Sequence, residues 1–159
     1  MATDATDAGI DSCMALRRGI RYNTKCDIKS GEQGRVRIFK NAWFERFARK
    51  QKIQNAVLRD AVHRAEQGLV DADLGGGVIK QRVARPGQGR SAGYRTVILY
   101  RQAHRAFFVY GFAKSHQANI SDEEEAAFKK AARHVLELTD QQLATLIRNG
   151  QFSEVDDYD

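Results

Sequence analysis

The sequence predicts an α+β fold in which a small twisted antiparallel sheet packs against helices. Two helical patterns at 41–67 come first, three apolar runs at 78–113 follow, and two helix-capping signatures lie in 121–149. With an alternating run at 35–39, they give the order strand, two helices, three strands, two helices. We therefore expect an N-terminal helical hairpin, a central sheet and C-terminal helices in one domain over residues 36–150.

Residues 1–35 differ from the rest of the chain. The stretch MATDATDAG lacks periodicity, and KCDIKSGEQG (25–34) is rich in turn-forming residues, so we expect a disordered extension. Cys13 and Cys26, the only cysteines, have neither the spacing of metal ligands nor that of a disulfide framework. No run is apolar enough to cross a bilayer, and the N-terminus lacks the apolar core of a signal peptide. We expect a cytoplasmic protein without membrane contact.

The first predicted helix begins at Asn41, because asparagine favours the N-cap position. Its apolar residues recur at helical spacing and form one core-facing stripe: Trp43, Phe44, Phe47 and Ala48. The second helix is expected over 54–67, and the glycine that follows, Gly68, is expected to end it. The DADLGGG segment at 71–77 is predicted to be a flexible turn.

Three strands are predicted in the centre of the chain, at 78–84, 94–101 and 106–113. Period-two alternation places Lys80 and Arg82 on one face of the first strand. In the second strand, Arg95 shares a face with Val97 and Leu99.

The last of these strands is apolar on both faces. Alternation predicts that Phe108, Tyr110 and Phe112 share one face, with Phe107 and Val109 on the other. A strand that is apolar on both sides belongs in the middle of a sheet, so we expect it to be central.

Two pairs of residues have the spacing of a capping box: Ser121 with Glu124, and Thr139 with Gln142. The two helices that they open are expected to end near Leu138 and at Asn149. Residues 151–159 are then predicted to form an acidic tail.

Positive charge is concentrated in the central strands. The formal net charge is +6, but residues 74–114 carry eight basic and no acidic side chains, whereas residues 115–159 carry four basic and ten acidic ones. So dense a group of cations repels itself unless an anion faces it, and phosphate is the obvious anion. The distribution therefore favours contact with nucleic acid or with an acidic protein.

Four segments occur in order along the chain: VRIFKNAWF (36–44), LGGGVIKQR (74–82), GQGRSAGYRT (87–96) and FFVYGFAKS (107–115). With these segments the sequence resembles the RelE/ParE superfamily of type II toxins, and most closely its RelE-like HigB branch. The resemblance covers about residues 36–150. It implies cleavage of mRNA on the ribosome, in the A site, without a metal or other cofactor. It also implies neutralisation by a cognate antitoxin, which we expect to be a helix-turn-helix DNA-binding protein.

Metal-free RNA cleavage needs a base for the 2′-OH proton, cations for the charge on the phosphorane and an acid for the 5′-oxygen. We interpret Lys80 as the base, with Arg82 beside it in the cleft that the resemblance implies. Arg95, in the G-Y-R motif, is expected to stabilise the transition state, because its planar fork matches a phosphate. The family tends to place an arginine after the last strand and a tyrosine beyond it. This chain has Lys114, Ser115 and His116 there, so His116 is the candidate acid.

Further side chains are candidates for binding RNA. Arg90 in the glycine-rich loop can reach a backbone phosphate, and Arg85 and Lys114 are additional cations near the predicted cleft. Tyr110 or Phe112 could stack on a base that is splayed out of the message.

Two other functions are compatible with the same residues. A ParE-like inhibitor of DNA gyrase would share the fold without cleaving RNA. A non-catalytic module that binds nucleic acid or an acidic protein would keep the basic patch and tolerate Lys80→Ala and Arg95→Ala with little loss.

Family members usually begin at the first strand, with methionine at the place of Val36. We therefore hypothesise that translation starts at a GTG codon at Val36 and that residues 1–35 are not translated. N-terminal sequencing or the intact mass of natively expressed protein tests this hypothesis, and a mass that includes Met1 or Ala2 refutes it.

Overall fold

The computed structural model describes residues 35–102 and 104–156. The chain divides into two units, Met1–Arg35 and Val36–Asp159, and the folded domain described below belongs to the second. The expectations for the N-terminal extension fall on residues 1–34, outside the described residues.

The described part of the second unit is built on a six-stranded sheet in the order β2-β3-β4-β5-β1-β6. Its strands have the following bounds: β1 Arg37–Asn41, β2 Ala72–Gly75, β3 Val78–Val83, β4 Tyr94–Arg101, β5 Arg105–Ala113 and β6 Phe152–Glu154. Neighbouring strands are antiparallel except β1 and β5, which run parallel. The expectation of a purely antiparallel sheet is wrong for that pair, because β1 inserts between β5 and β6 and not beside the strand that follows it in sequence. The expectation that β5 is central is confirmed.

Four helices accompany this sheet in the described residues: α3 Ala42–Gln51, α4 Asn55–Glu66, α5 Asp122–Val135 and α6 Asp140–Arg148. The predicted caps are present. The Asn41 side chain accepts a hydrogen bond from the backbone N–H of Phe44, and both predicted capping boxes form at the starts of α5 and α6. None of the described helices is long and apolar enough to pass through a bilayer.

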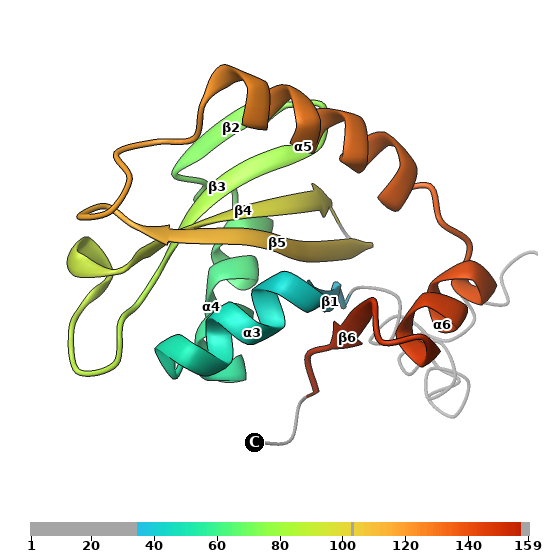
Figure 1. The fold of residues 1–159 in the computed structure, drawn as a ribbon, viewed down its shortest axis with the longest axis horizontal. Coiled ribbons are helices and arrows are strands. Elements are labelled where there is room, and N and C mark those ends of the chain that lie inside the picture. The colour runs from blue at the N-terminus through green and yellow to red at the C-terminus, as the bar shows by residue number, and fades with distance from the viewer. Residues whose placement is uncertain (1–34, 103, 157–159) are drawn as a thin grey trace, which may run out of the picture. The chain divides into compact units, whose positions relative to one another are not determined.

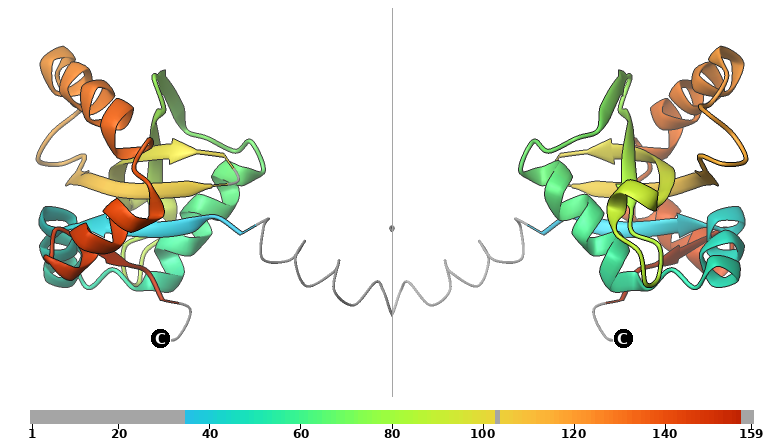
Figure 2. Two further views of the ribbon diagram at one scale, coloured as in Figure 1. Left: turned by 90° about the vertical axis from the view of Figure 1, so that its right-hand side faces the viewer. Right: turned by 90° about the vertical axis from the view of Figure 1, so that its left-hand side faces the viewer.

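The helices cover the two faces of the sheet separately (Figures 1 and 2). On one face, α3 and α4 bury a cluster with the sheet that includes Phe44, Leu58, Val62, Ile98 and Phe108. On the other, α5 and α6 bury a second cluster that includes Val78, Leu99, Phe107, Ala132 and Leu143. We call these the α3/α4 face and the α5 face.

Two short strands were not predicted. β2 lies in the segment 71–77 that was expected to be a turn, and it pairs with β3 as a hairpin. β6 lies in the expected acidic tail and pairs with β1, and Val155 beside it is buried in the α3/α4 cluster. Both strands are short, at four and three residues, so they offer too few positions for alternation to mark them.

A bulge in β5 changes the predicted faces of its aromatic residues. Val97 is opposite Tyr110, but the next residue, Ile98, is opposite Phe108, so Val109 has no partner in β4. Phe108 therefore packs in the α3/α4 cluster, whereas Phe112 is buried on the α5 face with Tyr110 packed against that cluster. The expectation that all three share one face is wrong, because an extra residue in a strand reverses the alternation beyond it.

Candidate active site

The strand register brings three predicted catalytic cations together on the α5 face. Arg82 of β3 is directly opposite Arg95 of β4, and Lys80 is opposite Val97. Because directly opposed residues point to the same side of a sheet, all three side chains share a face. A surface depression, which we call the cationic depression, is lined by Asp71, Ala72, Lys80, Gln81, Arg82 and Arg95.

Two of these cations are held by polar partners that the sequence did not predict. The Lys80 Nζ donates a hydrogen bond to Asn119 Oδ1 at 2.8 Å. Arg82 donates from Nε and Nη2 to Asp71 Oδ1, at 3.1 and 2.9 Å. Asp71 precedes β2 and Asn119 follows β5, so only the folded sheet places them beside β3. No sequence signal marks Asn119, and Asp71 stands out only as one of the last acids before the basic stretch.

Arg95 differs from its neighbours, because it forms no hydrogen bond or ion pair with any residue in the described part of the chain. Its side chain is half-buried at the lining of the cationic depression. A guanidinium in this position has all its N–H donors available for an incoming anion.

The Asp71 carboxylate remains ionised beside Arg82. Burial raises the pKa of Asp71, but the hydrogen bonds from the side chain and backbone of Arg82 outweigh burial and lower the pKa below its ordinary value. The Asp71 backbone N–H also donates to Oε1 of Gln81, a buried side chain, at 3.0 Å. The carboxylate is therefore tied to the core through its own main chain.

Arg85 and Arg90, two predicted RNA contacts, are not brought into this group. The Arg85 guanidinium lies 4.7 Å from the ring centroid of Tyr94, a residue of the α3/α4 cluster. Arg90 Nη1 lies 3.9 Å from Asp60 Oδ2 on α4. The loop between β3 and β4 thus directs both arginines toward the α3/α4 face.

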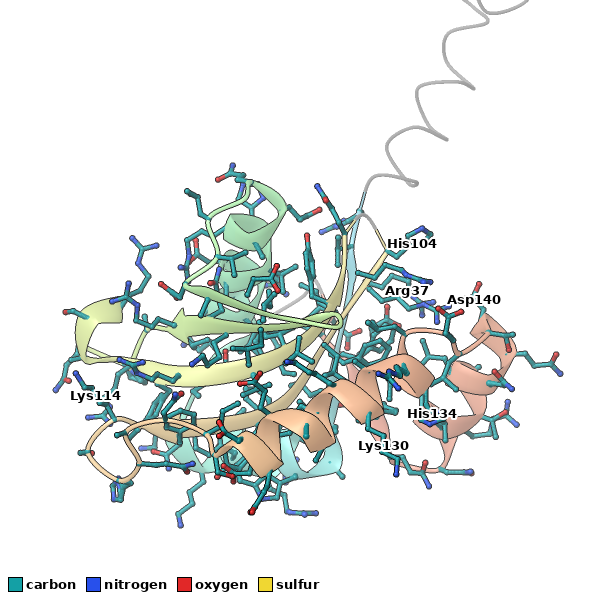
Figure 3. The ribbon with its side chains drawn as sticks, turned by 90° about the horizontal axis from the view of Figure 1, so that it is seen from above. Arg37, His104, Lys114, Lys130, His134 and Asp140 are labelled. Carbon is teal, nitrogen blue, oxygen red and sulfur yellow. The ribbon has the colours of Figure 1, made fainter. Side chains whose placement is uncertain are left out.

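Lys114 and His116 lie in the turn that follows β5, and both are exposed. In Figure 3, Lys114 is at the end of the sheet away from Arg37 and Asp140. His116 Nδ1 is 3.3 Å from Ser115 Oγ. Neither residue lines the cationic depression. Both residues follow Phe112 closely in the chain. Phe112 is opposite Arg95, and β5 ends at Ala113.

The predicted aromatic contacts differ in accessibility. Phe112 is only 5% exposed, so its ring is not free to stack on a base. Tyr110 is half-buried; its hydroxyl donates to Gln117 Oε1, and its ring stacks on Trp43 at a centroid distance of 4.8 Å. Burial and the nearby Glu124 raise the pKa of Tyr110. Trp43, expected in the core, is 40% exposed, because it lies at the edge of the helix face beside Tyr110.

The expectation that the basic stretch needs an external anion is wrong for four of its arginines. Their counter-charges come from distant parts of the chain, in the pairs Arg82–Asp71, Arg90–Asp60, Arg101–Glu137 and Arg105–Asp140. A count of charges along the chain misses these pairs, because the acidic partners lie outside the basic stretch. The other four bases of the stretch, Lys80, Arg85, Arg95 and Lys114, have no acidic partner among the described residues, and of these only Lys80 and Arg95 line the cationic depression.

A family model described as the RelE toxin of the RelE / RelB toxin-antitoxin system matches residues 36–155. This range contains all the strands and helices described above. Comparison with curated proteins gave no match, and neither did comparison with solved structures.

Proposed function

The chain belongs to the RelE toxin family, and we propose that it is a ribosome-dependent, metal-free mRNA endonuclease that inhibits translation. The observation that carries the proposal is the convergence of Lys80, Arg82 and Arg95 on one depression, with Arg95 unpaired within the described residues. A phosphodiester placed there would meet cations from two adjacent strands.

The proposed chemistry is an attack of the ribose 2′-oxygen on the adjacent phosphorus. Lys80, once its amine is neutral, would accept the 2′-OH proton, and Asn119 would keep that amine at the depression. Arg95 would bind the oxygens that become more negative in the phosphorane, with Arg82 beside it. The bond from phosphorus to the 5′-oxygen breaks, and His116 would supply the proton to that oxygen. The products are a 2′,3′-cyclic phosphate and a 5′-hydroxyl end.

The proposed substrate contacts extend from the depression along the end of β5. Tyr110 offers a partly exposed ring and Lys114 an exposed cation, which suit a base and a backbone phosphate of the message. Arg85 and Arg90 lie toward the α3/α4 face, so they would contact only RNA that passes around the end of the sheet to that face.

Toxins of this family pair with an antitoxin of the RelB type. We propose that the cognate antitoxin of this chain covers the cationic depression, because occupying the depression and matching its charge are achieved by the same contact. A helix-turn-helix DNA-binding antitoxin and the HigB branch remain predictions.

Induction in a bacterial host, followed by mapping of mRNA 5′ ends, tests the nuclease proposal. We expect new ends within translated codons for the wild-type chain, and a loss of at least about a hundredfold for Lys80→Ala and Arg95→Ala. Arg101→Ala is the matched control, since Arg101 lies on β4 but pairs with Glu137 outside the depression. Growth arrest with intact transcripts would overturn the proposal and favour a gyrase inhibitor.

A further inference from the structure

Asp71 binds Arg82 in a way that leaves one edge of the guanidinium open. Both hydrogen bonds from the guanidinium, from Nε and Nη2, reach the same oxygen, Asp71 Oδ1. The other oxygen, Oδ2, accepts the backbone N–H of Arg82 at 2.6 Å. Nη1 has no hydrogen-bond or ion-pair partner among the described residues, so the edge formed by Nη1 and Nη2 remains available.

The residue whose carboxylate holds Arg82, Asp71, is itself held in place by the buried side chain of Gln81. Gln81 is 1% exposed, and its Nε2 donates to the carbonyl oxygens of Ala61 and Leu69. Its Oε1 accepts the Asp71 N–H. The chain of contacts runs from α4 through a buried amide to the start of the β2–β3 hairpin. It fixes the direction in which the Asp71 carboxylate meets Arg82.

We propose that Asp71 is a positioning residue that presents the Nη1–Nη2 edge of Arg82 to the phosphate of bound RNA. This inference rests on the proposed function, because it requires RNA in the cationic depression. A guanidinium binds phosphate best through two parallel N–H donors, and a side chain already fixed in that orientation loses less conformational freedom on binding. The negative charge of Asp71 is thus compatible with RNA binding, although a carboxylate near phosphate would otherwise weaken it.

A double-mutant cycle tests the proposal through two measurements. The first is binding of a fluorescein-labelled 2′-O-methyl oligoribonucleotide, followed by anisotropy; its blocked 2′-oxygens prevent cleavage. The second is the initial rate of cleavage of ribosome-bound mRNA. The full-length variants are Asp71→Asn, Arg82→Ala and the double variant, each checked for folding by circular dichroism.

Asp73→Asn is the matched control. Asp73 lies in the same hairpin, and its Oδ1 accepts the Gly75 N–H at 2.8 Å, a role that asparagine can retain. The substitution removes the same charge without touching Arg82. It therefore measures the general gain in RNA affinity that follows when one negative charge is lost.

We expect Asp71→Asn to weaken oligonucleotide binding and to slow cleavage by about tenfold, relative to Asp73→Asn. The same substitution should have no further effect in the Arg82→Ala background. Binding by Asp71→Asn that equals or exceeds that of Asp73→Asn would overturn the proposal, because Asp71 would then be a counter-charge that RNA displaces. An equal loss with and without Arg82 would also overturn it, by showing a purely structural role.

The same experiment separates this inference from the proposed function. A wild-type chain that binds the oligonucleotide but leaves ribosome-bound mRNA intact would refute the nuclease proposal, and the binding cycle would still decide the role of Asp71. A wild-type chain that neither binds the oligonucleotide nor cleaves ribosome-bound mRNA would overturn both.

Discussion

Gly93 shows why a glycine precedes the tyrosine and arginine of the G-Y-R motif. Its backbone is extended, with φ −76° and ψ −178°, so the requirement is not conformational. A Cβ at Gly93 would lie 2.1 Å from the carbonyl oxygen of Val83, the last residue of β3. The absence of a side chain lets β3 and β4 approach closely just before Arg95.

Gly93→Ala should therefore lower the free energy of unfolding by about 3 kcal/mol, because the backbone of β3 has to move away. Gly89→Ala is the control in the same loop, where a Cβ would meet no atom within 4 Å and φ is −71°. We expect that variant to stay within about 0.5 kcal/mol of wild type. Urea denaturation of both variants gives the comparison, and equal stabilities would contradict the close approach.

Gln81 is the second residue whose importance is invisible in the sequence. It lies between Ile79 and Val83 on the α3/α4 face of β3, where an apolar residue would be expected. The structure shows why an amide is there: it donates to the carbonyl oxygens of Ala61 in α4 and of Leu69, and it accepts the N–H of Asp71 before β2.

Gln81→Met should destabilise the chain by about 2–3 kcal/mol, since it removes all three hydrogen bonds of a side chain that is 1% exposed. Gln88→Met, at an exposed position in the loop after β3, is the matched control and should cost almost nothing. Thermal or urea unfolding measures both. A Gln81→Met variant as stable as the control would show that water replaces the amide.

At the scale of the elements, the sequence predicted the helix caps and the strand alternation, because both depend on residues that are close together in the chain. Asn41, the two capping boxes and the alternation in β3 and β4 act within a few residues, so they can be recognised in a single sequence. β6 is held by pairing with β1, which is far away in the sequence, and both β2 and β6 are too short, at four and three residues, for alternation to be recognised. The local pattern around Val109 likewise gives no sign of the bulge in β5.

Glu45 joins three elements through one carboxylate, and its pH dependence is a test of that role. Glu45 Oε2 lies 2.7 Å from Lys40 Nζ on β1 and accepts a hydrogen bond from Ser153 Oγ on β6. Burial raises the pKa of Glu45, but the hydrogen bonds from Lys40 and Ser153 outweigh burial, and the pKa is lowered from its ordinary value of 4.5.

A group whose pKa is lowered by folding adds stability above its ordinary pKa, and that stability is lost as the pH falls through the lowered value. We expect Glu45→Gln to be less stable than wild type by about 1–2 kcal/mol at pH 7. The difference should shrink as the pH falls below 4.5. Urea unfolding at pH 7 and in steps below that value measures it, and a difference independent of pH would contradict the ionised carboxylate.

β6 allows a test at the same scale. A chain ending after Gly150 loses the pairing of β6 with β1, the buried Val155 and the ion pair of Arg37 with Glu154. We expect it to unfold at least about 3 kcal/mol more easily than a chain ending after Asp156, mainly through the lost apolar burial and strand pairing. Equal urea midpoints for the two chains would show that β6 contributes nothing.

For the whole molecule, the sequence predicted the positions of the three cations on regular strands better than those of the arginines in the loop. Lys80, Arg82 and Arg95 lie on regular strands, so their shared face follows from alternation and one antiparallel register. Arg85 and Arg90 lie in a loop whose direction no periodicity specifies. Asp71 and Asn119 come to the site only through tertiary structure.

The salt dependence of RNA binding reflects this arrangement of charge. For single-stranded RNA, each phosphate that the protein neutralises adds about −0.7 to the slope of log K against log salt. We expect Lys80→Ala and Arg95→Ala each to reduce the slope by about that amount. Arg90→Ala should leave it nearly unchanged, because Arg90 already faces Asp60. Anisotropy titrations over a salt series measure the slopes, and a full effect of Arg90→Ala would place RNA on the α3/α4 face.

The position of β1 in the sheet has a consequence for how the toxin is made. Of the described strands, β1 leaves the translating ribosome first, yet its two neighbours in the sheet, β5 and β6, are synthesised later, and β6 is the last of them. Sheets whose strands are far apart in the sequence assemble slowly, because the chain loses conformational entropy in bringing these strands together before their contacts stabilise it. A nascent chain thus completes this sheet only after the residues of β6 have left the ribosome.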